Sequence, residues 1–386
     1  MKADVIVIGG GVIGSSITYH LARDGVKVKQ LEKGSIANQG AASRASAGGI
    51  RLNNRDLREL PLAKASMKRW ESLEDELEAD LEYIPSGQVM LYDHRYSIEI
   101  LLRQAEEDEK NGIPARILNQ DDLKERIPFL SSLYAKGIFY PNGGQANPLL
   151  TTIAFSSAAR RLGAETATGV EVFSIETQNG SVTGVKTSSG FMPCHTVINA
   201  AGVWAPELHA ALGLTPLQMK PFCHQMSATY AAPKILPGPT ISAKDTKISL
   251  KQTIDGRIRA GGGYSAKTGP NQYSGSFNKE GLDEQRRTVL SIIPAIEDYE
   301  IDFTYYGAEA HSIDEIPILG RIPEVSGYLI AAGFSGHGFT ISPAVGQVIS
   351  EMTQHKIPAI PIDGLLIDRS FSNENISDGA IRHFPG

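Results

Sequence analysis

Cysteine is scarce in this sequence, and so are the features of extracellular, membrane or nucleic-acid-binding proteins. Its 386 residues include two cysteines, Cys194 and Cys223, too few for a disulfide framework, which favours a reduced interior. No run of about 18 apolar residues occurs, so we expect no transmembrane segment. The 37 Lys and Arg residues do not outnumber the 43 Asp and Glu residues, which argues against a nucleic-acid partner. Residues 1–4 lead into an expected strand without a signal-peptide core, so we predict a cytoplasmic protein.

The hydrophobic content of 41% and the charged content of 21% are those of a globular protein, and the length predicts two or three domains. Before residue 216 and after Pro317, apolar strands alternate with helical patterns. From 216 to 310, short β-like runs separated by Pro- and Gly-rich turns are typical of a mostly antiparallel sheet. The expected strands include 3–8, 26–32, 88–93, 169–177, 182–187, 222–230, 247–251, 257–262, 301–306 and 328–333. The expected helices are 57–80, 97–111, 148–162, 280–292 and one from about 343, with Ser342 as its cap and Pro343 in its first turn.

A dinucleotide-binding pattern lies near the N-terminus. The apolar run 3–8 is followed by glycines at 9, 11 and 14, and Glu32 ends the next expected strand, 21 residues after Gly11. Gly9 permits a tight turn, Gly11 admits a pyrophosphate and Gly14 allows close packing of helix and strand. A carboxylate at Glu32 suits the two ribose hydroxyls of an adenosine and repels a 2′-phosphate, which argues against NADP. The alternative is a structural βαβ turn with a surface glutamate.

Two further glycine-rich loops indicate a flavin. Residues 43–51 form a loop of small residues that a cofactor could pass closely. Residues 333–340 precede a helix, and their free N–H groups would suit the N1–C2=O edge of a reduced flavin.

With these segments in this order, the chain resembles the FAD-dependent D-amino-acid oxidase superfamily, in particular the glycine oxidase and sarcosine oxidase branch. The matching strings are VIVIGGGVIGSSITYHLA, LEKG, SRASAGGIR, TGVEV, VINAAGVWA, DEIPILGR and AAGFSGHGFTISPAVGQ, which together span residue 4 to about residue 350.

The resemblance implies a mixed α/β fold with two domains. A discontinuous Rossmann-type FAD-binding domain would take residues 1–80, 146–215 and 310–386, and a substrate domain with an antiparallel sheet would take 81–145 and 216–309. Val170 would meet the adenine, and residues 43–50 and 336–340 would flank the isoalloxazine. The expected FAD-binding residues are Gly9, Gly11, Val12, Ile13, Gly14, Glu32, Lys33, Ser43, Arg44, Ala47, Gly48, Gly49, Ile50, Val170, Ala201, Gly202, Gly333, Gly336, His337, Gly338, Phe339 and Thr340.

The implied chemistry is oxidation of a C–N bond in a small-molecule amine or amino acid. The α-carbon passes hydride to flavin N5, and water hydrolyses the resulting imine; no dedicated side-chain base is required. The electron acceptor would be O₂, or a partner subunit or quinone in a hetero-oligomer, and a homo-oligomer is equally compatible. Two alternatives stay open: a dehydrogenase subunit, and a non-catalytic flavin-binding subunit.

The departures from the family pattern concern the carboxylate anchors and the flavin linkage. Thr340 stands where the sarcosine oxidase branch has a lysine, and Glu309 stands where the glycine oxidase branch has an arginine. Gly307 occupies the place of the cysteine that links FAD in some relatives, so we expect non-covalent FAD. The Glu-Ala before the D-x-x-P motif resembles opine and hydroxyproline dehydrogenase subunits.

These departures define the candidate substrate residues. Glu309 would favour a cationic or hydrogen-bond-donating group, and the alternative is that it pairs with an arginine at the domain interface. A substrate carboxylate would then bind elsewhere, and the candidate residues for binding it are basic. The full set is Arg51, Lys251, Arg259, Glu309, His311 and Thr340. Cys194-His195 and Cys223-His224 superficially resemble a metal set, but strand neighbours point to opposite faces, so we expect no metal.

Overall fold

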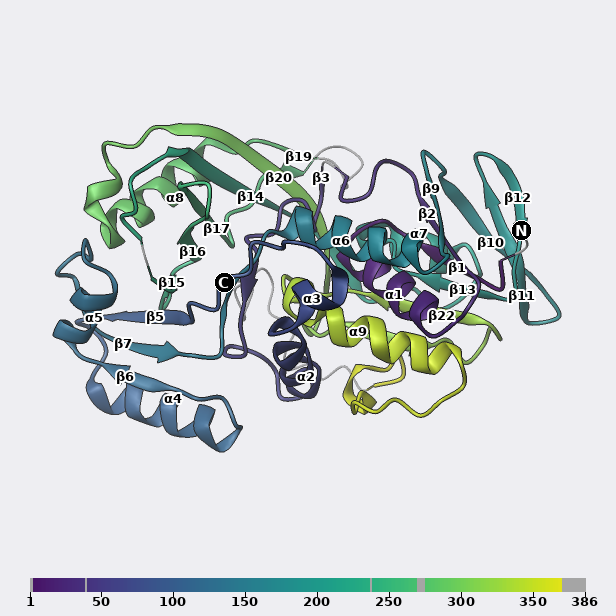
Figure 1. The fold of residues 1–386 in the computed structure, drawn as a ribbon, viewed down its shortest axis with the longest axis horizontal. Helices are drawn as coiled ribbons and strands as arrows, with labels where there is room; N and C mark the ends of the chain where they lie inside the picture. The colour runs from purple at the N-terminus through teal and green to yellow at the C-terminus, as the bar shows by residue number, and fades with distance from the viewer. Residues whose placement is uncertain (1–2, 39, 237, 269–274, 370–386) are drawn as a thin grey trace.

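The computed structural model describes residues 3–38, 40–236, 238–268 and 275–369, and it is built around two large β-sheets (Figure 1). The first sheet has six strands, of which β21 and β22 are antiparallel and all the other neighbours are parallel. Its strands, in spatial order, are β21 (Ile318–Arg321), β22 (Tyr328–Ala332), β13 (Thr196–Asn199), β1 (Val5–Ile8), β2 (Val28–Glu32) and β9 (Glu165–Thr168).

Strand β1 is buried on both faces, as the apolar run predicted. Val5 and Val7 belong to one core cluster, whereas Ile6 and Ile8 belong to another. Helices cover the first face: α1 (Val12–Arg23), α2 (Leu60–Trp70), α3 (Leu73–Leu77), α6 (Pro148–Arg161) and α9 (Gly338–Thr353). The second face packs against α7 (Ala205–Ala210) and a three-stranded antiparallel sheet of β10 (Val172–Gln178), β11 (Ser181–Thr187) and β12 (Gly190–Pro193).

The second large sheet has nine strands and is mostly antiparallel, with parallel pairs at β3–β20 and β15–β5. Its strands, in spatial order, are β3 (Gly40–Ala41), β20 (Ile301–Ser312), β14 (Met219–Ala231), β17 (Arg257–Gly262), β16 (Ile248–Gln252), β15 (Thr240–Ala243), β5 (Gln88–Asp93), β7 (Tyr134–Tyr140) and β6 (Arg116–Leu118). These strands come from the segments predicted for the substrate domain, 81–145 and 216–309, apart from β3 and the end of β20.

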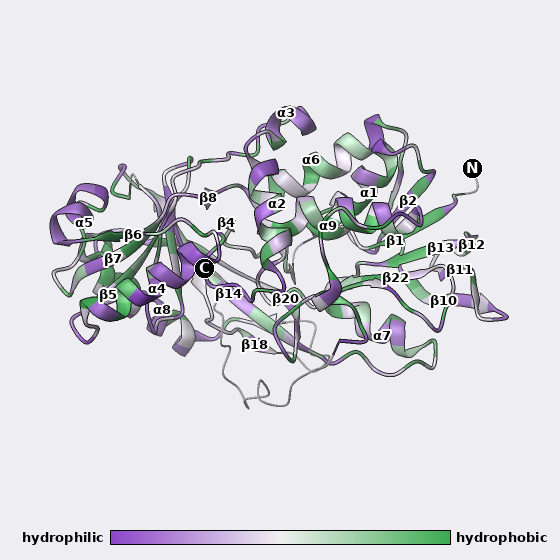
Figure 2. Ribbon diagram, turned by 90° about the horizontal axis from the view of Figure 1, so that it is seen from below, coloured by the Kyte–Doolittle hydropathy of each residue, from purple (hydrophilic) through white to green (hydrophobic). Residues whose placement is uncertain are grey.

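Further helices and short strands surround the two large sheets. Figure 2 shows that hydrophobic residues concentrate in the strands, whereas α3 and α5 are largely hydrophilic. No helix in the described ranges is both long and apolar enough to cross a membrane. The remaining elements are α4 (Ile98–Lys110), α5 (Gln120–Arg126), α8 (Lys279–Ile292), β4 (Gly49–Ile50), β8 (Gly144–Gln145), β18 (Lys267–Thr268), β19 (Gly275–Ser276), and the 3₁₀ turns Gly202–Trp204, Pro294–Ile296 and Asp363–Leu365.

The predicted start of the last helix was wrong. Helix α9 begins at Gly338, so Pro343 lies inside it. Proline lacks the N–H that would bond the carbonyl four residues earlier. The Ser342 hydroxyl donates to that carbonyl, on Phe339, at 3.0 Å, which replaces the missing bond and lets the helix continue through the proline.

Strand β20 is longer than the predicted strand 301–306. It continues to Ser312 because β14 pairs with it along its length, from Thr229 opposite Ile301 to Met219 opposite Ser312. In Figure 1 these two long strands run from the nine-stranded sheet toward the six-stranded one. The extension carries residues 307–312 into the region between the two sheets.

Candidate active site

A cavity of about 390 Å³ lies between the two large sheets. Its wall includes the turn after β1, the end of β2, the 41–49 loop, the last part of β20 and the 333–339 loop. Most of the FAD-binding residues predicted from the sequence line it. Those outside the lining are Gly14, Arg44, Gly48, Ile50, His337 and Thr340.

The glycine-rich turn has the geometry that the sequence pattern requires. Gly9 has a φ of +115°, and a Cβ added there would lie 2.4 Å from the Ala200 carbonyl oxygen. A Cβ on Gly14 would lie 2.2 Å from the carbonyl oxygen of Gly9, so helix and strand meet too closely for a side chain. A Cβ on Gly11 would meet only the Ser43 hydroxyl, at 3.0 Å, and Gly11 lines the cavity.

The acidic residue at the end of β2 is held in place by backbone amides. The carboxylate of Glu32 accepts the Gly10 N–H at 2.6 Å on one oxygen and the Gly34 N–H at 2.7 Å on the other. Lys33 lies beside it with its ammonium 3.4 Å from the centre of the Trp204 ring. All three side chains at this end, Glu32, Lys33 and Trp204, line the cavity, which suits an adenosine.

Helix α1 starts where a pyrophosphate would lie. Gly11 precedes the helix and has no side chain to cap it. The first N–H groups of the helix, beside the residues that line the cavity, can therefore bind an anion. The Val12 N–H donates to the Ser43 hydroxyl at 2.9 Å. Since a hydroxyl can also donate to a phosphate oxygen, Ser43 fits the phosphate-binding role that the loop implied.

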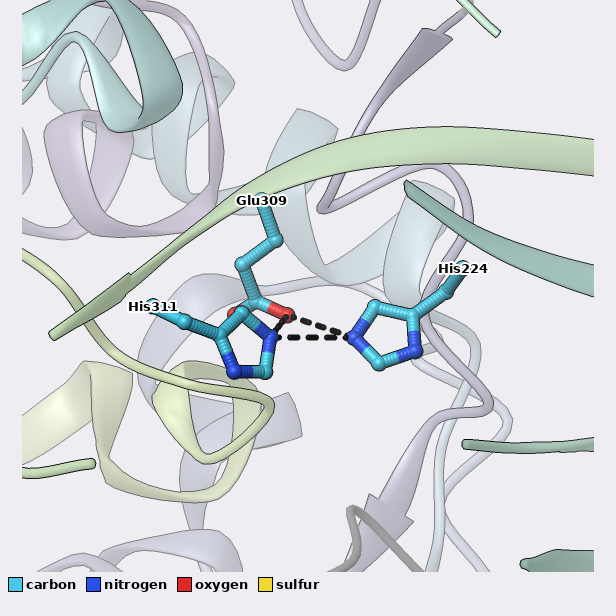
Figure 3. A group of neighbouring side chains, drawn as sticks. All are labelled: His224, Glu309 and His311. Atoms are coloured by element: carbon cyan, nitrogen blue, oxygen red, sulfur yellow. Dashed lines mark hydrogen bonds and ion pairs between the residues drawn. The ribbon is translucent and has the colours of Figure 1, made fainter. Parts of the chain in front are cut away.

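At the opposite end of the cavity, three side chains from two strands converge (Figure 3). His224 comes from β14, and Glu309 and His311 come from β20. The His224 Nε2 lies 3.2 Å from the His311 Nε2 and 3.3 Å from Glu309 Oε2, and the His311 Nε2 lies 3.7 Å from the same oxygen. We call these three residues the His–Glu–His cluster.

The charge of Glu309 is maintained by its neighbours. Burial raises the pKa of its carboxyl, but hydrogen bonds and charge from His224 and His311 outweigh burial and hold that pKa well below its usual range. The other oxygen accepts the Gly336 N–H at 2.8 Å. In the described part of the chain, Glu309 therefore pairs with histidines and an amide, and the arginine partner considered as the alternative was wrong.

The remaining candidate substrate residues lie outside the cavity lining. Thr340 is 2% exposed, and its hydroxyl donates to the Gly49 carbonyl at 3.3 Å. Arg51 is 4% exposed and donates to the carbonyls of Asn53 and Asn54. Lys251 and Arg259 line a separate small cavity of about 10 Å³. Burial and the charge of Arg259 lower the pKa of Lys251 to about 7.

His337 occupies a buried ion-pair network rather than the cavity wall. Its Nδ1 lies 2.9 Å from Glu59 Oε2, and both side chains are fully buried. Burial lowers the pKa of His337 to about 4, although Glu59 opposes the shift. The contribution of residues 333–340 to the cavity therefore comes from their glycines and from Phe334 and Phe339.

His224 was not among the site residues predicted from the sequence, where its only notable neighbour is Cys223. The available signal was the pair Glu309 and His311, which are two residues apart and share one face of a strand. That signal was hidden because the strand was expected to end at 306.

A parallel sheet with a glycine-rich turn, an acidic residue after its second strand and a second sheet across one cavity defines a dinucleotide-binding oxidoreductase. The sequence profile of the FAD dependent oxidoreductase (DAO) family matches residues 4–352. The chain belongs to this family, which confirms the resemblance, the mixed α/β fold and FAD as the cofactor.

Known proteins are similar to this chain in sequence or in structure. Glycine oxidase of Bacillus licheniformis is 27% identical over 367 residues, which cover 91% of this chain and 93% of that protein. The structure of L-proline dehydrogenase from P. horikoshii matches with a TM-score of 0.87 and 30% identity, covering 95% of this chain and 96% of that one.

A mitochondrial relative of Mus musculus, the pyruvate dehydrogenase phosphatase regulatory subunit, is 26% identical over 374 residues, which cover 93% of this chain. This chain spans only 42% of the length of that relative.

Proposed function

We propose that this protein oxidises a C–N bond of an amino acid or a secondary amine with FAD. The observation that carries the proposal is a single cavity that joins the dinucleotide end at Glu32 to a polar end at His224 and Glu309. The names of the relatives, glycine oxidase and L-proline dehydrogenase, agree with this class of substrate.

The residues of the chain fit FAD along the whole cavity. Glu32 would hold the ribose, and the start of α1 with Ser43 would hold the pyrophosphate. At the other end, the 333–339 loop leads into α9, whose N-terminal N–H groups favour negative charge on the ring. Bound FAD would accept a hydride from the carbon next to the substrate nitrogen.

The cofactor is non-covalent in this proposal. Gly307 pairs with Gly40 of β3, and a Cβ added to Gly307 would lie 2.6 Å from the Ala41 carbonyl oxygen. A linking side chain therefore has no room at this position. Acid precipitation should release the flavin into the supernatant, and flavin retained in the pellet would contradict non-covalent binding.

In the metal-free chain, Glu309 sets the charge that a substrate meets at the polar end. The carboxylate faces the cavity and disfavours a substrate carboxylate, while it attracts an amine or a guanidinium. A unit-charge pair at about 4 Å is worth roughly 4 kcal/mol at an effective dielectric constant near 20, before desolvation. A quarter of that energy would change affinity about fivefold.

The decisive experiment is anaerobic mixing of the purified protein with a panel of amines and amino acids. We expect at least one compound to bleach the bound flavin. Reoxidation of the bleached protein by O₂ indicates an oxidase, whereas reoxidation by an artificial acceptor alone indicates a dehydrogenase that passes electrons to a partner or quinone.

A second candidate function is favoured by the mouse relative, which is named a regulatory subunit. In that case the chain would bind FAD without catalysis as part of a larger complex. Flavin that is bound but never reduced by any member of the panel would support this function and contradict the first.

A further inference from the structure

The His–Glu–His cluster is placed by the pairing of two strands. In the register of β14 and β20, Phe222 lies opposite Glu309 and His224 lies opposite Gly307. Residues paired across two strands point to the same side of the sheet, and so does every second residue along one strand. His224, Glu309 and His311 therefore share one face.

The spacing of the three side-chain atoms matches that of ligands around one tetrahedral metal ion. Zinc bonds imidazole nitrogen at about 2.0–2.1 Å and carboxylate oxygen at about 2.0–2.2 Å, so its ligand atoms lie about 3.3–3.5 Å apart. The observed separations are 3.2 Å between the two nitrogens, and 3.3 Å and 3.7 Å from the nitrogens to Glu309 Oε2. A metal ion could therefore contact all three atoms with little rearrangement.

The hydrogen-bond pattern of His224 leaves its Nε2 able to act as a metal ligand. Its Nδ1 lies 3.1 Å from the Gly262 carbonyl oxygen, which can only accept, so Nδ1 carries a hydrogen. In a neutral imidazole the Nε2 then presents a lone pair. That lone pair faces the His311 Nε2 at 3.2 Å and a carboxylate oxygen of Glu309 at 3.3 Å, so it is directed toward the point where a bound cation would contact all three atoms.

His224 and Glu309 each make a second hydrogen bond of the kind that metal ligands make. Metal-binding histidines commonly donate their second N–H to a carbonyl, and metal-binding carboxylates are themselves hydrogen-bonded. His224 donates to Gly262, and Glu309 accepts the Gly336 N–H on the oxygen that does not face the histidines. Both ligands are thus oriented before any ion arrives.

We propose that His224, Glu309 and His311 bind one divalent transition-metal ion of the zinc type, with the fourth position open to the cavity. His224 and Glu309 line the cavity, so a ligand there can reach the ion. Because two neutral histidines and one carboxylate leave a net positive charge on a divalent ion, the fourth ligand is a carboxylate of the substrate. This last step rests on the proposed amino-acid oxidation, whereas the metal site does not.

The first test is the zinc content of the flavin-containing protein, purified without a histidine tag, equilibrated with Zn²⁺ and passed through a desalting column. We expect one zinc per chain in the wild type. His311→Ala and the nearly isosteric Glu309→Gln should weaken zinc binding by roughly a hundredfold or more, because each removes a ligand. His195→Ala, which removes an exposed histidine far along the chain, is the matched control and should keep one zinc.

Flavin content and gel filtration show whether each variant is folded, and Glu309→Gln keeps the test decisive if His311→Ala does not fold. Wild-type protein that retains no zinc overturns the metal site. Zinc that persists unchanged in both cluster variants also overturns it.

A second measurement tests the fourth ligand. Acetate is titrated into zinc-loaded and chelator-treated wild type while the flavin spectrum is followed. We expect acetate to bind about tenfold more tightly to the zinc-loaded form, which corresponds to about 1.4 kcal/mol. Equal affinities would overturn the carboxylate role. Anaerobic flavin reduction of the same samples tests the proposed function separately, since zinc can be bound whether or not an amine bleaches the flavin.

Discussion

The two ends of the cavity are built in different ways. At the dinucleotide end, Glu32 is held by amides of Gly10 and Gly34, and all of these lie within one βαβ unit. At the polar end, His224 meets Glu309 and His311, which are more than 80 residues away in the sequence. The first end is therefore a local motif, whereas the second exists only because two long strands pair. Substitutions can test this contrast.

The largest effect is expected at the dinucleotide end. In Gly11→Leu a bulky side chain would fill the space for the pyrophosphate, so the purified protein should lose nearly all of its flavin. Gly11→Ala is the matched control, because its Cβ would meet only the Ser43 hydroxyl and should cost much less flavin. Flavin absorbance per chain measures both, and a Gly11→Leu protein with full flavin would show that this turn is not the binding site.

The next effect concerns Lys251, which lies outside the cavity lining. Its pKa is lowered from 10.5 to about 7, so the unfolded chain binds more protons between these two values and stability rises with pH across that window. Lys251→Met should therefore raise the melting temperature most below about pH 7, and the gain should shrink toward pH 10. One unit of pKa shift corresponds to about 1.4 kcal/mol.

Melting curves of both proteins at several pH values, with flavin content held equal, measure the difference. A gain from Lys251→Met that is the same at low and high pH would show that the lysine is not charged and buried as described.

A smaller effect is expected for charge selectivity at the polar end. In chelator-treated protein, Glu309→Gln should lower kcat/KM about fivefold for substrates with a second basic group and leave neutral substrates unchanged. Steady-state rates with matched neutral and basic amines measure the ratio. An equal loss for both classes would contradict a charge interaction with the substrate.

The smallest effect is expected at Thr340, where the hydroxyl donates to the Gly49 carbonyl at 3.3 Å. Thr340→Val keeps the shape but removes this bond, so we expect a loss of about 1 kcal/mol in unfolding free energy. Thr340→Ser keeps the hydroxyl and is the control. If Thr340→Val instead changes substrate affinity without affecting stability, the side chain faces the substrate as the family pattern implied.

The elements predicted from the sequence were those with a strong local pattern. Strand β5 was predicted at its observed bounds, Gln88–Asp93. Asn179 and Gly180, which lie between the expected strands 169–177 and 182–187, form the hairpin turn between β10 and β11 with positive φ values of 51° and 74°. The start of α9 was misplaced because Pro343 is normally a first-turn residue. The Ser342 hydroxyl that compensates for it depends on the folded helix, which no local pattern reveals.

By itself the sequence determined the family, FAD as the cofactor and the glycine-rich turn after β1, because a strand, a tight turn and a helix are specified by neighbouring residues. Only the tertiary structure decided what lies at the other end of the cavity. His224 reaches Glu309 through the pairing of β14 with β20, and Lys251 and Arg51 lie outside the lining. Side chains far apart in sequence meet only when the register of paired strands is set, and that register depends on the packing of the whole sheet.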